Sequence, residues 1–172
     1  MNLILKPLKK AHISAFKLEM QEAFQKGYEA KYGASKEAVL PEKDIDDSLI
    51  AEGAEAYEAI IDGRRVGGAI VSIQRDRRHN HLDFLYVKTE CQSRGIGKDI
   101  WKALEALHSD TQVWETVTPY FEQRNIHFYV NQCGFHIVEF FNKYHLFPNM
   151  ITGFTTGDCM FRLEKRMRGE GD

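Results

Sequence analysis

The chain has 172 residues, 43% hydrophobic and 28% charged, so we expect one globular domain over residues 1–172 with a full core. Its formal net charge of -2 argues against nucleic acid as a partner, because each phosphate contact needs a lysine or arginine. No stretch approaches the roughly 20 apolar residues of a membrane helix, so neither membrane insertion nor export is predicted. The cysteines Cys91, Cys133 and Cys159 form no C-x-x-C pair and predict reduced thiols in a cytoplasmic protein.

The first half of the chain predicts a strand, an amphipathic helix and then a hairpin. Leu3 to Leu8 is a candidate strand, and apolar residues at helical spacing predict a helix over Lys10 to Gln25 that stops at Gly27. The polar stretch Tyr28 to Glu55 holds a short helix near Asp44 to Ala51. Asp62-Gly63 is typical of a tight turn between two strands, which we place at Ala56 to Ile61 and Val66 to Ile73.

The second half alternates strands and helices. Apolar periodicity predicts two helices, Ile96 to His108 and Phe121 to Cys133, the second ended by Gly134. Strands are expected before, between and after them, at His81 to Val87, Val113 to Val117, Phe135 to Phe141 and Cys159 to Leu163. The resulting order βααβββαβαββ predicts an α+β or mixed α/β arrangement around one sheet.

The most informative segment runs from Gln92 to Lys98, where a polar turn after a strand opens a helix. Gly95 and Gly97 let the backbone approach a ligand, and a helix start offers unpaired N–H groups and a positive dipole end. The turn therefore predicts an anion site that suits a pyrophosphate, with added charge from Arg94 and Lys98.

Two other nucleotide-binding motifs fail on spacing. The dinucleotide fingerprint needs a small residue where Ile100 stands. The Walker A loop needs glycine at Gln92 and serine or threonine at Asp99.

The pattern Q-x-x-G-x-G after the strand L-x-x-L-Y-V resembles the acetyl-CoA motif of the GNAT superfamily of N-acetyltransferases. Asn125 and the run from Phe128 to Phe135 are similar to that family's N-x-x-x-x-Y-x-x-x-G-F segment, and the resemblance extends over residues 3–164. It implies a mixed, mostly antiparallel sheet of about six to seven strands with about four flanking helices. It also implies transfer of acetyl from acetyl-CoA to an amine of a small molecule or peptide, with no metal.

The resemblance assigns cofactor roles to several residues. The amides of the turn, here Arg94, Gly95, Ile96, Gly97 and Lys98, would hold the pyrophosphate, with Gln92 and Ser93 beside them. The strand end Leu85, Tyr86 and Val87 would pair its backbone with the pantetheine arm. Asn125 would contact the same arm.

Two catalytic roles follow from the reaction. Aminolysis of a thioester needs a proton for the departing thiolate, and Tyr129, at the family's tyrosine position, is the candidate general acid. The candidate bases are His81 and Asp83, which alternate onto one side of a strand, and Glu115 in the next strand. His81 stands where the best-known family members have a glutamate. A water chain with no single base is an equal alternative.

Partners are predicted only in outline. His79 and His81 lack a third metal ligand at useful spacing, so we expect no metal. The acidic segment Tyr28 to Glu55 and the segment Tyr144 to Gly157 are expected to select the acceptor, and the acidity favours a cationic amine. A solvated helix-loop-helix with no ligand is an equal alternative for Tyr28 to Glu55. The aromatic segment Phe140 to Phe147 predicts a homodimer. A non-catalytic module that binds CoA or acetyl-CoA is the alternative function.

Overall fold

The computed structural model describes residues 2–148 and 159–168. Its seven strands are β1 (Leu3–Pro7), β2 (Ala54–Ile61), β3 (Arg64–Ser72), β4 (His79–Val87), β5 (Val113–Pro119), β6 (His136–Phe141) and β7 (Met160–Arg166). Its helices are α1 (Ile13–Tyr32), α2 (Glu42–Ile50), α3 (Ile96–Leu107) and α4 (Gln123–His127), which continues as a π-helical segment, Phe128–Cys133. Short 3-10 turns lie at Lys10–His12 and Thr89–Cys91.

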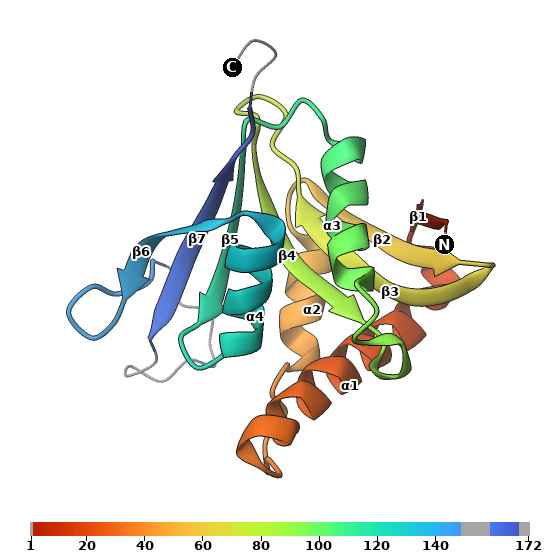
Figure 1. The fold of residues 1–172 in the computed structure, drawn as a ribbon, viewed down its shortest axis with the longest axis horizontal. Helices are drawn as coiled ribbons and strands as arrows, with labels where there is room; N and C mark the ends of the chain where they lie inside the picture. Colours follow the sequence, from red (N-terminus) through yellow and green to blue (C-terminus); the bar gives the residue numbers. More distant parts are fainter. Residues whose placement is uncertain (1, 149–158, 169–172) are drawn as a thin grey trace.

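All seven strands belong to one sheet in the order β1-β2-β3-β4-β5-β7-β6. Among the described residues, only β4 and β5 form a parallel pair, and the other neighbouring strands pair antiparallel. The mixed, mostly antiparallel sheet and its flanking helices confirm the predicted fold class and element order (Figure 1).

Two apolar cores lie on opposite faces of this sheet because residues of a strand alternate between its faces. On one face Ile100, Trp101 and Leu104 of α3 pack with Trp114 and Leu163 of the strands. On the other face the side chains come from α1, α2 and the strands, and include Phe16, Met20, Ile45, Ile70 and Tyr86. In Figure 1, α3 lies in front of the sheet and α2 behind it.

The parallel pair β4 and β5 separates after a short common stretch. Their register covers only His79 with Val113, Asn80 with Trp114, and His81 with Glu115. Figure 1 shows the two strands side by side at their starts and apart at their ends. In the described ranges, no strand pairs with the β5-facing edge of β4 from Leu82 onward. The backbone N–H and C=O groups of this edge are therefore available to another partner. We call the point of divergence the fork.

A β-bulge lies in β4 at the fork. Leu82 pairs with Val71 and Phe84 pairs with Ile70, so Asp83 is the extra residue. Leu82 consequently packs with the α3 core while Phe84 packs with the α1 core, although simple alternation would place both on one face. The bulge thus changes the direction of the side chains at the fork.

Several predicted boundaries were wrong. Gly27 does not stop α1, which continues to Tyr32 and ends at Gly33 in a left-handed conformation, φ 84°. A mid-helix glycine costs about 1 kcal/mol, and the ring of Tyr28, which packs edge-on against Phe121 at 5.9 Å, supports the extension. The segment Phe121 to Cys133 starts as a helix only at Gln123.

The remaining boundaries shift by a few residues. Strand β4 begins at His79, two residues before the prediction, and the strand expected at Cys159 to Leu163 is Met160–Arg166. The predicted turn at Asp62-Gly63 is confirmed, with φ values of 50° and 74°. No helix in residues 2–148 or 159–168 has the length and apolar character needed to span a bilayer.

Candidate active site

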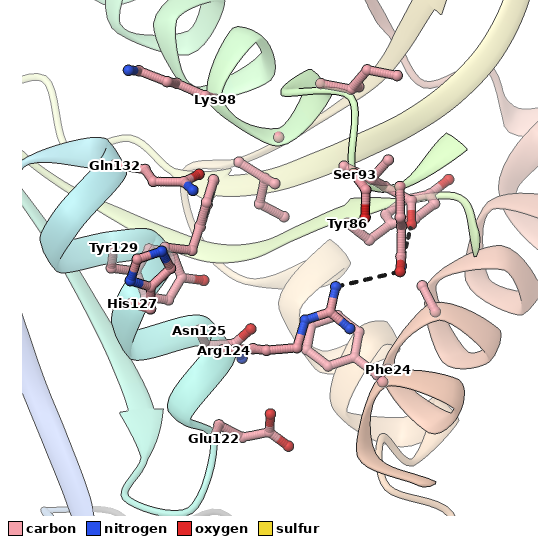
Figure 2. A pocket seen from close by; sticks show the side chains of 18 of the residues that line it. Phe24, Tyr86, Ser93, Lys98, Glu122, Arg124, Asn125, His127, Tyr129 and Gln132 are labelled. Atoms are coloured by element: carbon pink, nitrogen blue, oxygen red, sulfur yellow. Dashed lines mark hydrogen bonds between the residues drawn. The ribbon is translucent and has the colours of Figure 1, made fainter. Parts of the chain in front are cut away.

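A cleft of about 450 Å³ lies between α1, the turn before α3 and the helix α4. Its walls include nearly all of the predicted cofactor residues, namely Leu85, Tyr86, Val87, Gln92, Ser93, Gly95, Ile96, Gly97, Lys98, Asn125 and Tyr129. Figure 2 shows the labelled lining residues on separate elements around the cleft, with Lys98 and Tyr129 on different walls. Arg94, in the same turn, is exposed and does not line the cleft.

The turn before α3 has the geometry of an anion site. Ser93 and Gly95 adopt left-handed φ values of 66° and 75°, and α3 begins directly afterwards at Ile96. The first N–H groups of a helix have no intrahelical acceptor, and the helix dipole is positive at that end. The Gln92 side-chain amide donates to the Val87 carbonyl at 3.2 Å and ties the turn to the end of β4.

The end of β4 contributes backbone to the cleft. The side chain of Tyr86 turns away from it, packs edge-on against Phe16 at 5.3 Å and donates its hydroxyl to Glu19 at 2.8 Å. Leu85 and Val87 pack against the α3 core instead. Both faces of this strand end are therefore packed. Its β5-facing edge is left to bind a ligand in the cleft through the backbone.

One stripe of α4 and its π-helical continuation faces the cleft, and Tyr129 is its most buried member. The stripe consists of Glu122, Asn125, Phe128, Tyr129 and Gln132, spaced as one face of a helix. Tyr129 is 6% exposed, and burial raises the pKa of its phenol above its ordinary value near 10. The neighbouring Thr116 hydroxyl offsets a smaller part of that rise. The phenol is therefore protonated at neutral pH.

Thr116 marks the position of the fork. Its hydroxyl donates to the Leu82 carbonyl at 2.9 Å, which joins β5 to β4 just past their last paired residues. Tyr129 packs with the α3 core and so lies on the α3 face of the fork. The side chains of His81 and Asp83 lie on the opposite face, because Asp83 accepts a hydrogen bond from Ser48 of α2.

The three candidate bases do not line the cleft, and they fall into two groups. His81 Nδ1 lies 2.7 Å from Asp83 Oδ1, so the predicted shared side of these two residues is confirmed. Glu115 is the cross-strand partner of His81, but its carboxylate accepts from Arg162 at 3.1 Å and lies 3.3 Å from His79 Nε2.

His79, Glu115 and Glu164 bring three potential metal-ligand atoms within 4.8 Å of one another. This group could not be predicted from local spacing, because its third member comes from β7. The Arg162 guanidinium donates to both carboxylates. A guanidinium in this position neutralises the charge that would attract a metal ion.

Other residues of the cleft were missed by sequence reasoning. Phe24 and Tyr28 line it from α1, and Arg124 reaches from α4 to Gln92 Oε1 at 3.4 Å (Figure 2). The helical spacing around Asn125 contains the signal for Arg124 and Phe128, but nothing in the α1 sequence indicates a ligand.

The acidity expected to select a cationic acceptor is partly neutralised. Lys17 donates to Glu42 and Asp46 at 2.7 Å each, and Lys43 donates to Asp47 at 2.5 Å. Of the second acceptor segment, Tyr144 to Gly157, residues 149–157 lie outside the described residues.

Comparisons with known proteins agree with this arrangement. The model of the Acetyltransferase (GNAT) family matches residues 17–135. The protein YrkN of Bacillus subtilis (strain 168) is 47% identical over 148 residues, which cover 86% of this chain and 80% of YrkN.

Solved structures share the fold at low sequence identity. The PaiA N-acetyltransferase from Thermoplasma acidophilum in complex with coenzyme A has a TM-score of 0.69 at 17% identity, over 97% of this chain and 100% of that one. A GNAT family acetyltransferase from Elizabethkingia anophelis with acetyl-CoA bound has a TM-score of 0.64 at 18% identity, over 96% and 99% of the two chains. The chain belongs to the acetyltransferase (GNAT) family and is an acyltransferase of the N-acetyltransferase type.

Proposed function

We propose that this protein transfers an acetyl group from acetyl-CoA directly to an amine of a small molecule or peptide. The observation that carries the proposal is the fork, where an unpaired strand edge, an anion-binding turn and a buried phenol border one cleft. A donor with a pyrophosphate at one end and a thioester at the other would fit these three surfaces. The pyrophosphate would lie at the turn and the thioester beside the phenol.

The turn and the strand edge bind different parts of acetyl-CoA. The amides at Gly95 to Lys98 hold the pyrophosphate, with the Lys98 side chain beside them. The backbone of Leu85 to Val87 pairs with the amides of the pantetheine arm as a neighbouring strand would. Asn125 contacts the same arm from α4. These contacts direct the thioester toward the fork.

Tyr129 supplies the proton for the leaving group. The amine nitrogen forms a bond to the thioester carbonyl carbon, the C–S bond breaks, and the phenol protonates the thiolate. Because burial raises the pKa of Tyr129, the phenol keeps its proton until the thiolate develops beside it. The amine approaches from the α2 face of the sheet, opposite Tyr129.

We expect the acetyl group to move without a covalent acetyl-enzyme. Burial raises the pKa of the Cys133 thiol to about 12, so it holds too little thiolate to act as a nucleophile at neutral pH. Cys91 packs against the α3 core outside the cleft lining. Cys91→Ala and Cys133→Ala should each retain at least about a third of the wild-type kcat, because a positioned nucleophile is worth far more than that. An acetylated cysteine that forms and decays as fast as turnover, seen by mass spectrometry, would overturn this expectation.

The amine can be found by a screen that reads the free thiol of CoA. Purified protein is mixed with acetyl-CoA and a panel of monoamines, polyamines, amino acids and peptide N-termini. The proposal predicts amine-dependent thiol release and an acetylated product by mass spectrometry for at least one class. Tight binding of acetyl-CoA with no amine-dependent release across the panel would favour the non-catalytic module instead.

We also propose a homodimer. Phe140 is 43% exposed on the edge strand β6, beside the exposed Tyr120 and next to Phe161. Tyr144 and Leu146, which follow β6 in the chain, are also exposed. Because an aromatic patch on an edge strand favours association, light scattering at micromolar concentration should give the mass of two chains. Phe140→Lys should give one chain, and a single-chain mass for the wild type would rule the dimer out.

The free cysteines Cys91, Cys133 and Cys159 suit a reducing compartment, and we propose the cytoplasm.

A further inference from the structure

The face of the fork opposite Tyr129 carries a chain of hydrogen bonds centred on Asp83. Its carboxylate lies 2.7 Å from His81 Nδ1, accepts from the Ser48 hydroxyl at 2.5 Å, and receives the Ser72 hydroxyl at 3.3 Å. These partners come from β4, α2 and β3, so the aspartate is held from three elements. Asp83 is also the extra residue of the β-bulge, which fixes its direction.

This arrangement leaves Asp83 poorly placed to accept a further proton. Both of its oxygens already have hydrogen-bond partners. These hydrogen bonds occupy the oxygen lone pairs that would receive the proton of the amine. Asp83 therefore orients a neighbour and does not itself deprotonate the amine.

His81 is that neighbour. A carboxylate can only accept, so the ring must donate through Nδ1–H, which leaves the lone pair on Nε2. Among residues 2–148 and 159–168, the only side-chain hydrogen bond of His81 is the one to Asp83. The side chain is 32% exposed, so Nε2 can be reached from the α2 face.

The position of His81 fits the reaction. It forms the last paired position of β4 and β5, with Glu115, where the strands begin to separate. Tyr129 lies on the other face of the same fork. An amine that attacks a thioester held between the strands would meet His81 on one side, and the thiolate would leave toward Tyr129 on the other.

The other ionisable groups considered around His81 do not bond to its ring. Glu115 is bound to Arg162 and paired with His79, and Asp44 lies one helical turn before Ser48 on α2. None of these is hydrogen-bonded to the His81 ring in the described part of the chain. Asp83 is therefore the group that determines its tautomer.

We propose that His81 is the general base of the acetyl transfer and that Asp83, held by Ser48 and Ser72, is the positioning residue that fixes its tautomer. His81 Nε2 accepts a proton from the attacking amine as the N–C bond forms and the C–S bond breaks, and Tyr129 gives a proton to the sulfur. Water then removes the proton from His81 and restores that of Tyr129, so the reaction is balanced. This proposal rests on the proposed acetyltransferase function and assigns roles within it.

The kinetic test compares His81→Gln with the control His79→Gln, a histidine on the same face of β4 that does not contact Asp83. With an amine from the screen, His81→Gln should lower kcat by about 10² to 10⁴, while the KM for acetyl-CoA stays within a few-fold. The acid limb of kcat/KM should disappear. His79→Gln should retain both the rate and the limb.

The positioning role needs a separate readout. Asp83→Asn should lower kcat by about tenfold or more and weaken the preference for the Nδ1–H tautomer of His81 seen by long-range NMR, because an amide holds that N–H less strongly than a carboxylate does. Ser48→Ala should cause a smaller loss, and Ser48→Thr, which restores the hydroxyl, should recover most of it.

A measurement on the wild-type protein does not depend on activity. Long-range ¹H–¹⁵N NMR at alkaline pH should show His81 protonated at Nδ1, with the signal assigned by its absence in His81→Gln. Protonation at Nε2, or wild-type rates for His81→Gln with an unchanged acid limb, would overturn the assignment while leaving the acetyltransferase intact. Failure of the wild type to acetylate any amine would instead remove the proposed function, and the assignment with it.

Discussion

Replacing Gly97 with valine should weaken acetyl-CoA binding by at least about 100-fold, or roughly 2.7 kcal/mol. Gly97 lies in the first turn of α3, where free amides face the cleft. A Cβ added at Gly97 would lie 3.1 Å from the Phe128 ring, and both residues line the cleft, so valine should crowd the space in which we expect the cofactor. Isothermal titration calorimetry with acetyl-CoA measures the loss.

Gly97 is a better test than Gly95, where valine should also abolish binding. Gly95 has a φ of 75°, so a β-branched residue there strains the turn. Lost binding in that variant would not distinguish a blocked site from a misfolded turn. The control is Ala106→Val on the exposed side of α3, which also adds a β-branched side chain to this helix but outside the cleft lining. A folded Gly97→Val protein with unchanged affinity would disprove the role of the turn.

Removing the Tyr129 hydroxyl should lower kcat by about 10² to 10⁴, equivalent to about 3 to 5 kcal/mol in the barrier. Tyr129→Phe keeps the ring, which packs against Phe135 at 5.7 Å, and so retains the core. The turn at Gly95 to Lys98 is unaffected, so the KM for acetyl-CoA should stay within a few-fold. Steady-state kinetics with the amine from the screen measures both constants.

The pH profile gives a second check on Tyr129. The active form is the neutral phenol, and burial raises its pKa above 10, so the wild type should lose activity through Tyr129 only above about pH 10. Tyr57→Phe is the matched control, because it removes a phenol hydroxyl outside the cleft, where Tyr57 donates to Glu55. Equal kcat values for Tyr129→Phe and wild type would show that Tyr129 is a core aromatic. Water would then supply the proton for the leaving thiolate.

The sequence predicted those parts of the site that depend on local backbone geometry. The turn from Gln92 to Lys98 needs only a strand end, two glycines and a helix start, and all three are visible in consecutive residues. Tyr129 and Asn125 follow from helical spacing and the resemblance to a known motif. The order of the strands and helices followed from periodicity in the same way, because each element repeats at 2.0 or 3.6 residues.

The parts that escaped prediction depend on contacts between distant segments. Ser48 meets Asp83 only because α2 packs beside β4, 35 residues later in the chain. The bulge at Asp83 is a register shift between two strands and has no marker within β4. Gly27 suggested a helix stop, yet the packing of Tyr28 against Phe121 favours a longer helix. Tertiary contacts outweighed the local preference there.

The most direct test of the account is the stoichiometry of a single turnover. Protein in excess is loaded with acetyl-CoA, the amine found by the screen is added, and free CoA and acetylated amine are both measured over time. The fork mechanism predicts that the two products appear at the same rate and in equal amounts, with little CoA released when the amine is left out. CoA released at the same rate with and without the amine, or no CoA released at all from fully bound acetyl-CoA, would contradict direct transfer at the fork.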